Sequence, residues 1–354
     1  MIKKIGFFVV MAAIIAAFGG CQKEELTERQ LTDEEVQPQK VVQPDVYVED
    51  DYLVFKDIET YSKISDELDL MTEEEYSVWE KELGFFSARS LLNEVYTKLD
   101  EEESEENYQR VKNEYNGRLI FTSDRDIKLP FYATAWDKVL NAEGVMKIGH
   151  TLYKFDSEKE IMIMDGSSSD LKSLDKIAND TTKVKVFYPH KNNLLKSVQW
   201  GELAKGDIKT PDGKIVLNWS YQLISLYYTG YGYGSTYYTE NGFELKHWMR
   251  QKRKTLWWSY NKTQYYMTNM NLHIEFWKMY EGVYIYPKFV YNQNIPDYTS
   301  PETTQGCTYL FMRYYDVLPG YYSQVIPEIY NNNFTFWSRG VDYSRRETII
   351  YSNQ

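Results

Sequence analysis

The sequence has little cysteine and little histidine, and both scarcities narrow the classes of protein that fit it. Only 2 of the 354 residues are cysteines, Cys21 and Cys307. So few thiols exclude a disulfide-stapled scaffold, and stability must come from a hydrophobic core. None of the 4 histidines stands in a zinc-binding motif or at helical ligand spacing; they are His150, His190, His247 and His273. We expect no metal site and no cofactor.

Motifs of catalysis are also missing. The sequence contains no nucleophile elbow, no phosphate-binding glycine loop and no dinucleotide fingerprint. The spacing of its carboxylates does not indicate general acid–base catalysis. Cys307, between Gly306 and Thr308, fits a small residue beside a strand better than a nucleophile. His247 and His273 lie on predicted strands and could meet across a sheet. These absences favour a protein that is not an enzyme.

Long apolar runs are absent except near the start. Lys3 and Lys4 precede 14 apolar residues, 5–18, and Gly19-Gly20-Cys21 follows them. A membrane-spanning helix needs about 20 such residues. A positive start, a short apolar core and small residues before a cut site are typical of a secretory signal. The sequence therefore predicts a signal peptide over residues 1–20, with an uncleaved membrane anchor as the alternative.

The residues around the predicted cut site resemble two bacterial signals. Phe18-Gly19-Gly20-Cys21 resembles a lipobox, in which small residues precede the cysteine that receives lipid, although Phe18 stands where leucine is usual. The following Lys23, Glu24 and Glu25 resemble the export signal of Bacteroides-type surface lipoproteins. This resemblance implies a protein held in the outer membrane by lipid on Cys21 and facing the cell exterior. The alternative for these three residues is the start of an acidic linker.

Negative charge is concentrated in the first third of the chain. The net charge is −12, but residues 21–115 hold 28 acids against 10 bases, and residues 116–354 hold 24 acids against 28 bases. The first of these segments is acidic and the second is nearly neutral, so neither has the basic character expected of a nucleic-acid binder. Residues 21–46 are polar and have no apolar periodicity, which is typical of a flexible tether.

Periodicity changes along the rest of the chain. Over residues 47–116, apolar residues recur at helical spacing, with a capping box at Thr72 and Glu75 and a stop at Gly84. Residues 117–200 read as a small mixed β region, in which Gly149-His150 forms a hairpin loop. Residues 201–354 carry β-branched and aromatic residues with frequent turn signals, including Asn241-Gly242. We expect an α+β protein whose carboxy-terminal domain is a mainly antiparallel, sandwich-like β structure.

Two segments combine aromatic residues with other features. Between positions 227 and 238, glycines alternate with tyrosines that could be presented to a ligand; the alternative is a glycine-bulged hairpin whose rings cover the core. The tyrosines are Tyr227, Tyr228, Tyr231, Tyr233, Tyr237 and Tyr238. In the second segment, Lys246, Trp248, Arg250, Lys252 and Lys254 share one side of an extended strand. We expect these cations to protect an exposed sheet edge rather than to bind a polyanion.

Two further stretches, residues 51–56 with the helix around Trp79–Phe85 and residues 141–149, resemble a group of Bacteroides surface lipoproteins that share a domain of unknown function. This resemblance carries no catalytic residues. We expect a lipid-anchored, non-enzymatic binding or adhesion module for a glycan or a host macromolecule. A surface hydrolase with a site assembled from distant strands, or a structural subunit of an envelope complex, are the alternatives.

Surface display predicts that a protease added to intact cells degrades the protein, because lipid on Cys21 then holds the folded part outside the cell. Immunoblotting of treated cells measures this. A protein retained in the periplasm would survive the treatment, and its survival would contradict the export prediction from Lys23, Glu24 and Glu25.

Overall fold

The computed structural model describes residues 44–180, 182–187, 201–231, 237–280, 283–316, 324–339 and 347–351. In parts of several strands it describes the backbone but not the side chains. The predicted signal peptide and nearly all of the tether lie outside these ranges. Among the described residues, no helix has the length and apolar character needed to cross a membrane.

Six helices occur among the described residues, and their ends follow the sequence closely. The α2 helix has the predicted capping box, in which the Thr72 side chain accepts from the Glu75 amide, and it ends at Gly84 with φ of 70°. The acid run Asp100–Glu106 spans the junction between two helices. The helices are α1 (Ile58–Leu70), α2 (Glu73–Leu83), α3 (Ala88–Glu101), α4 (Glu105–Glu114), α5 (Ser168–Lys172) and α6 (Leu174–Ile177), with a 3₁₀ turn η1 (Thr134–Trp136).

The first sheet joins the beginning of the folded chain to its middle. Its strand order is β1-β2-β5-β6-β7-β8, and only the pair of β2 and β5 is parallel. The predicted hairpin around Gly149-His150 is confirmed, and His150 is exposed. The strands are β1 (Val46–Glu49), β2 (Tyr52–Phe55), β5 (Val145–Ile148), β6 (Thr151–Phe155), β7 (Glu160–Ile163) and β8 (Val184–Phe187); a separate small hairpin pairs β3 (Ile120–Phe121) with β4 (Ile127–Lys128).

Two antiparallel sheets make up the carboxy-terminal part. One has the order β12-β11-β10-β9, with β16 also paired to β11; the other has the order β14-β13-β17-β18, with β15 paired to β13. The strands are β9 (Gly201–Lys209), β10 (Ile215–Tyr231), β11 (Tyr237–Lys254), β12 (Trp258–Tyr260), β13 (Tyr265–Tyr280), β14 (Val283–Ile295), β15 (Tyr298–Thr299), β16 (Gly306–Asp316), β17 (Gln324–Ser338) and β18 (Glu347–Tyr351). The chain is thus a mixed α and β protein with several antiparallel sheets.

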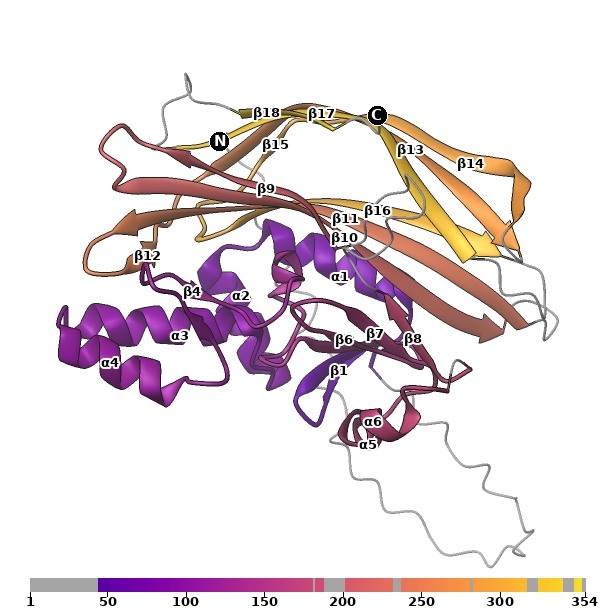
Figure 1. Cartoon of the computed structure of the whole chain (residues 1–354), viewed down its shortest axis with the longest axis horizontal. Coiled ribbons are helices and arrows are strands. Elements are labelled where there is room, and N and C mark those ends of the chain that lie inside the picture. Colours follow the sequence, from indigo (N-terminus) through magenta and orange to yellow (C-terminus); the bar gives the residue numbers. More distant parts are fainter. Residues whose placement is uncertain are drawn as a thin grey trace, which may run out of the picture. The chain divides into compact units, whose positions relative to one another are not determined.

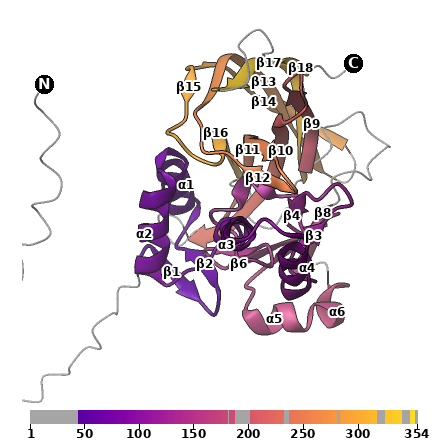
Figure 2. The same ribbon diagram turned by 90° about the vertical axis from the view of Figure 1, so that its left-hand side faces the viewer.

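The sheet of β9, β10, β11 and β16 lies between the helices and the second carboxy-terminal sheet (Figures 1 and 2). Strand alternation divides its side chains between two environments. On one face, Leu217, Trp219 and Leu245 join a hydrophobic cluster with Met267 and Phe336 of the other sheet. The opposite face turns toward the helices and the first sheet, so both faces of this sheet are covered.

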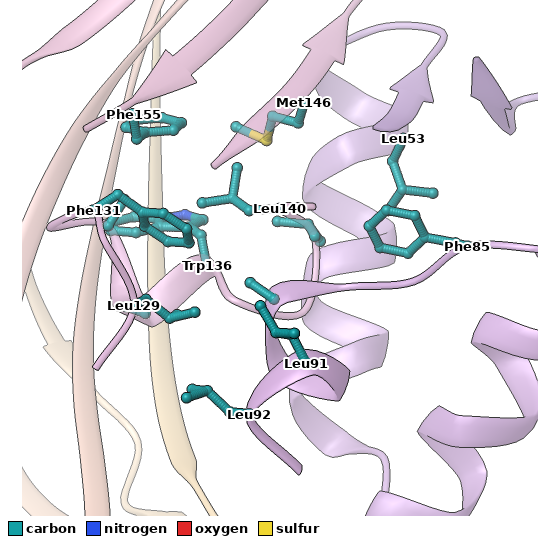
Figure 3. Packing of buried hydrophobic residues seen from close by; sticks show 14 of the residues in the cluster. Leu53, Phe85, Leu91, Leu92, Leu129, Phe131, Trp136, Leu140, Met146 and Phe155 are labelled. Carbon is teal, nitrogen blue, oxygen red and sulfur yellow. The ribbon is translucent and has the colours of Figure 1, made fainter. Parts of the chain in front are cut away.

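The largest hydrophobic cluster lies under that opposite face. It combines residues of the helices, the first sheet and the connection from residue 119 to residue 140. Figure 3 shows Trp136 and Leu140 among Leu91 of α3, Met146 of β5 and Phe155 of β6. Because these side chains come from distant parts of the sequence, the helical and β segments form one core.

Two strand predictions were wrong. Asn241-Gly242 is not a hairpin turn, because β11 continues through it, with Asn241 opposite Tyr227 and Gly242 opposite Leu226. The strands are also longer than expected, with 17 residues in β10 and 18 in β11. An Asn-Gly pair favours a turn only locally, and pairing with β10 and β16 on both sides outweighs that preference.

The predicted basic edge was also wrong, and the correction identifies the main polar contact of the fold. The β11 strand is central, and Lys246, Arg250 and Lys252 are only 2%, 3% and 7% exposed. Each ion-pairs with an acid from the amino-terminal half. We call these three pairs the charged seam: Lys246 with Asp69 at 3.3 Å, Arg250 with Asp137 at 3.0 Å, and Lys252 with Asp126 at 2.7 Å.

Asp137 connects the seam to the helices. Its carboxylate accepts from Arg89 of α3 at 3.0 Å, from Arg250 at 3.0 Å and from the Gln305 amide at 3.3 Å. Arg89 also pairs with Glu73 of α2 at 2.8 Å. Burial alone would raise the pKa of Glu73, but the charge of Arg89 and hydrogen bonds from two threonines outweigh burial and lower it. One buried carboxylate thus serves two arginines.

Replacing Asp137 with alanine should leave both arginines buried without their main counter-ion. We expect Asp137→Ala to lower the free energy of unfolding by about 3–5 kcal/mol, measured by urea denaturation. Asp45→Ala is the control, because Asp45 pairs with Lys56 on the surface and should cost less than about 1 kcal/mol. Equal losses in the two variants would contradict the role given to Asp137.

Candidate functional site

A pocket of about 600 Å³ lies beside the charged seam. Its floor is a grid of nine side chains, three from each of the adjacent strands β9, β10 and β11, all on the face turned toward the helices. The strand registers place them in three rows: Lys209, Val216 and Lys252; Asp207, Asn218 and Arg250; Lys205, Ser220 and Trp248. Eight of the nine carry a polar group. We call this grid the polar floor.

A polar floor is unusual on a sheet face that is covered by protein. Farther along the same face, Ile224 and Leu226 are buried in the hydrophobic cluster, as the fold requires. At the pocket the same alternation presents Asn218 and Ser220 instead. A break in local patterning without loss of order is typical of functional sites.

The wall of the pocket comes from the segment between residues 120 and 134. The β3–β4 turn is closed by Thr122, whose amide donates to the Asp126 carbonyl at 2.9 Å, and Arg125 adopts a φ of 65°. Arg125 Nη1 donates to the Leu256 carbonyl at 3.3 Å. These contacts hold the wall against the connection between β11 and β12.

Gln222 anchors the other end of the wall. The backbone amide of Ala135 donates to Gln222 Oε1 at 3.0 Å, and Gln222 Nε2 donates to Thr134 Oγ1 at 2.9 Å and to Ser220 Oγ at 2.8 Å. One buried amide side chain therefore fixes η1 on β10 and orients the Ser220 hydroxyl of the floor.

Two floor cations are neutralised by their surroundings. Lys252 Nζ donates to both carboxylate oxygens of Asp126 at 2.7 Å, and the Arg250 guanidinium lies 3.8 Å from the ring centroid of Tyr260 while it pairs with Asp137. A ligand therefore meets a floor of fixed dipoles and paired charges. The exposed lysines at the rim are Lys128, Lys205 and Lys209.

Aromatic side chains line the pocket together with these polar groups. Tyr132, Trp248, Trp258 and Tyr260 are each partly exposed there. The Tyr260 ring is further supported by Tyr96 of α3, at a centroid distance of 4.3 Å. Partly exposed rings beside hydrogen-bonding groups can bind a ligand that has both apolar faces and hydroxyl groups.

A buried carboxyl group lies behind the wall. Glu160 is fully buried at the start of β7, where it accepts from the Tyr132 hydroxyl at 3.3 Å and from the Ser225 amide at 3.4 Å. Burial raises the pKa of Glu160 to about 8, although both hydrogen bonds act in the opposite direction. At neutral pH the group is mostly protonated, and it connects the pocket residue Tyr132 to β10.

The structure does not bring the predicted ligand-binding tyrosines to this pocket. Tyr227, Tyr228 and Tyr231 lie on the backbone of β10, and Tyr237 and Tyr238 lie on that of β11. Asn218 and Tyr227 are nine residues apart, or roughly 30 Å along a strand. The side chains of these tyrosines, and all of Tyr233, lie outside the described residues, so that site stays a prediction.

The lipidation and export residues Cys21, Lys23, Glu24 and Glu25 also lie outside the described residues. His247 belongs to β11 and His273 to β13, which lie in different sheets. His247 packs on Phe336 with ring centroids 4.5 Å apart, and burial lowers its pKa to about 3. Within the described ranges, no group of three or more histidine, cysteine, aspartate or glutamate residues could hold a metal ion.

The sequence did contain a signal for the pocket floor. Polar and apolar residues alternate from Leu217 to Leu223, and cations alternate from Lys246 to Lys254. Alternation shows that one face is polar but not whether water or protein covers it. The pattern alone therefore predicts a solvent-exposed basic face, because the acids that neutralise it lie more than 100 residues away in the chain.

Comparisons with known proteins do not assign a function to this pocket. No protein-family model matches the chain, and no curated protein matches it. The crystal structure of a DUF4848 family protein from Bacteroides thetaiotaomicron is similar over 86% of this chain and 100% of that chain, with 16% identity and a TM-score of 0.29. A similarity at this TM-score carries no argument about function.

Replacing Glu160 with glutamine should change how stability depends on pH. Because the folded state raises the pKa of Glu160, it favours the protonated form, and stability is lost as the pH rises from about 4.5 to about 8. Over that range, wild type should lose up to about 1.4 kcal/mol per pH unit relative to Glu160→Gln, measured by urea denaturation. Glu158→Gln, at an exposed position, should run parallel to wild type; a parallel Glu160→Gln curve would contradict the raised pKa.

Proposed function

We propose that the protein is a lipid-anchored, cell-surface module of Bacteroides type that binds a glycan in the pocket over β9, β10 and β11. The observation that carries the proposal is the polar floor, in which eight of nine inward-facing side chains are polar. Partly exposed rings of Tyr132, Trp248 and Trp258 stand around it. Glycans present hydroxyl groups and apolar ring faces together, which suits this combination.

We also infer that the two carboxy-terminal sheets pack as an antiparallel sandwich. The supporting observation is the hydrophobic cluster that joins Trp219 and Leu245 of one sheet to Met267 and Phe336 of the other. In this arrangement the sandwich is the rigid support for the pocket. The charged seam then fixes the helical half as the opposing wall.

The surface location and the pocket fit one function. Lipid on Cys21 would hold the protein at the outer membrane, and the acidic tether would separate the folded part from the headgroups. A binding module in that position meets extracellular polysaccharide or host glycan first. Neither the pocket nor the tether requires a cofactor or nucleic acid.

A glycan array probed with the purified mature chain tests the proposal. We expect wild type to bind a defined set of glycans, and Asn218→Trp, which fills the pocket, to lose at least tenfold in affinity. Asn294→Trp is the matched control, because Asn294 is exposed on β14 and does not line the pocket. Circular dichroism of each variant measures its folding.

Two results would contradict the proposal. Binding to no glycan by a folded wild-type chain would argue against the function. Glycan binding that survives Asn218→Trp but is lost on replacement of Tyr227 and Tyr228 would move the site to the tyrosine segment. Release of shortened sugars from a bound glycan would instead favour the hydrolase alternative.

A further inference from the structure

Three residues of the polar floor carry buried polar atoms that make no hydrogen bond within the described part of the chain. They are the amide oxygen of Asn218, the indole Nε1–H of Trp248 and the Nε–H of Arg250. Native proteins satisfy most buried polar groups, so unsatisfied ones gathered at a pocket call for an explanation. Asn218 and Arg250 are cross-strand partners, and Trp248 lies two residues from Arg250 on the same face.

The orientation of the Asn218 amide is fixed by its neighbour. Its Nδ2 donates a hydrogen bond to Asp207 Oδ1 on β9. The reverse orientation would place the amide oxygen against a carboxylate oxygen, which is repulsive. The amide oxygen is therefore an acceptor that has no partner, beside two donors that have none.

We infer that the ligand is an uncharged saccharide, and that Asn218 and Trp248 determine specificity through its hydroxyl groups. This inference rests on the proposed function. A carboxylate or sulfate group could accept from the Trp248 and Arg250 donors but could not donate to Asn218. An ammonium group could donate but could not accept. Neighbouring hydroxyl groups on a sugar ring do both.

The charges at the centre of the floor also favour a neutral ligand there, whereas the exposed lysines Lys128, Lys205 and Lys209 stand at the rim. Lys252 is paired with Asp126 at 2.7 Å, and Arg250 is paired with Asp137 at 3.0 Å. An anionic group entering here would compete with these carboxylates for cations that already have partners. A neutral ligand requires no such exchange.

Asn218 and Trp248 are positioned to reach a ligand. Both side chains line the pocket and are partly exposed there. Arg250 is held more firmly, since its Nη2 donates to Asp137 and to Gln305 and its guanidinium lies on the Tyr260 ring. We therefore assign specificity to the first two side chains and a supporting role to Arg250.

Isothermal titration calorimetry with the full-length mature chain tests this inference. The probes are neutral hexasaccharides (maltohexaose, cellohexaose, xylohexaose and mannohexaose) and acidic ones (hexagalacturonate and a heparin hexasaccharide). We expect binding of a neutral probe. Trp248→Phe, which removes the indole N–H together with the five-membered ring, and Asn218→Leu, which keeps the shape, should each weaken it three- to tenfold.

Trp79→Phe is the matched control, because Trp79 lies on α2 and does not line the pocket; it should leave affinity unchanged. An O-methylated form of the bound probe, which cannot donate, should lose affinity for wild type but lose less for Asn218→Leu. Thermal melting of each variant tests its folding separately.

The outcomes separate the inference from the proposed function. Neutral binding that is lost in Asn218→Trp but unchanged in both Trp248→Phe and Asn218→Leu would overturn the hydroxyl recognition and leave the pocket in place. Binding of the acidic probes alone would overturn the neutral ligand. Binding of no probe, together with an empty glycan array, would overturn both.

Discussion

The buried carboxylate of Asp137 is the contact on which the arrangement of the two halves depends. It lies between Arg89 of the helices and Arg250 of the β-sheet, and all three side chains are at most 4% exposed. Buried ion pairs add little net stability when both partners are present, but separating them leaves a charge without compensation. The charged seam therefore acts mainly on specificity: few other alignments of β11 on the amino-terminal half would give Lys246, Arg250 and Lys252 an acid each.

The same contact shapes the pocket. Because Asp137 and Asp126 neutralise Arg250 and Lys252, the floor can be polar without carrying a strong field. Gln222 and the β3–β4 turn then hold the wall at a fixed place over the sheet. The aromatic rings stand on this framework, so the chemistry of the pocket is a consequence of how the halves are joined.

Local features of the fold were predictable from the sequence. The capping box at Thr72, the stop at Gly84 and the hairpin around Gly149-His150 involve residues that are neighbours in the chain, where propensity and capping act directly. Long-range features were not. The cations of β11 meet partners 113 to 177 residues away, and alternation cannot show which acids cover them. For this reason the sequence pattern alone predicts an exposed edge at the basic face and gives no indication of the pocket floor beside it.

The seam also has a consequence for the order of folding. Asp69, Asp126 and Asp137 emerge early in synthesis, whereas their partners on β11 follow more than 100 residues later. Until β11 pairs with β10 and docks, Asp69 and Asp126 lack their lysine partners on β11, and Asp137 has Arg89 but not Arg250. Contacts of such high sequence separation slow folding. We therefore expect the two halves to complete folding together in the last step, and neither half should reach its native packing while the other is absent.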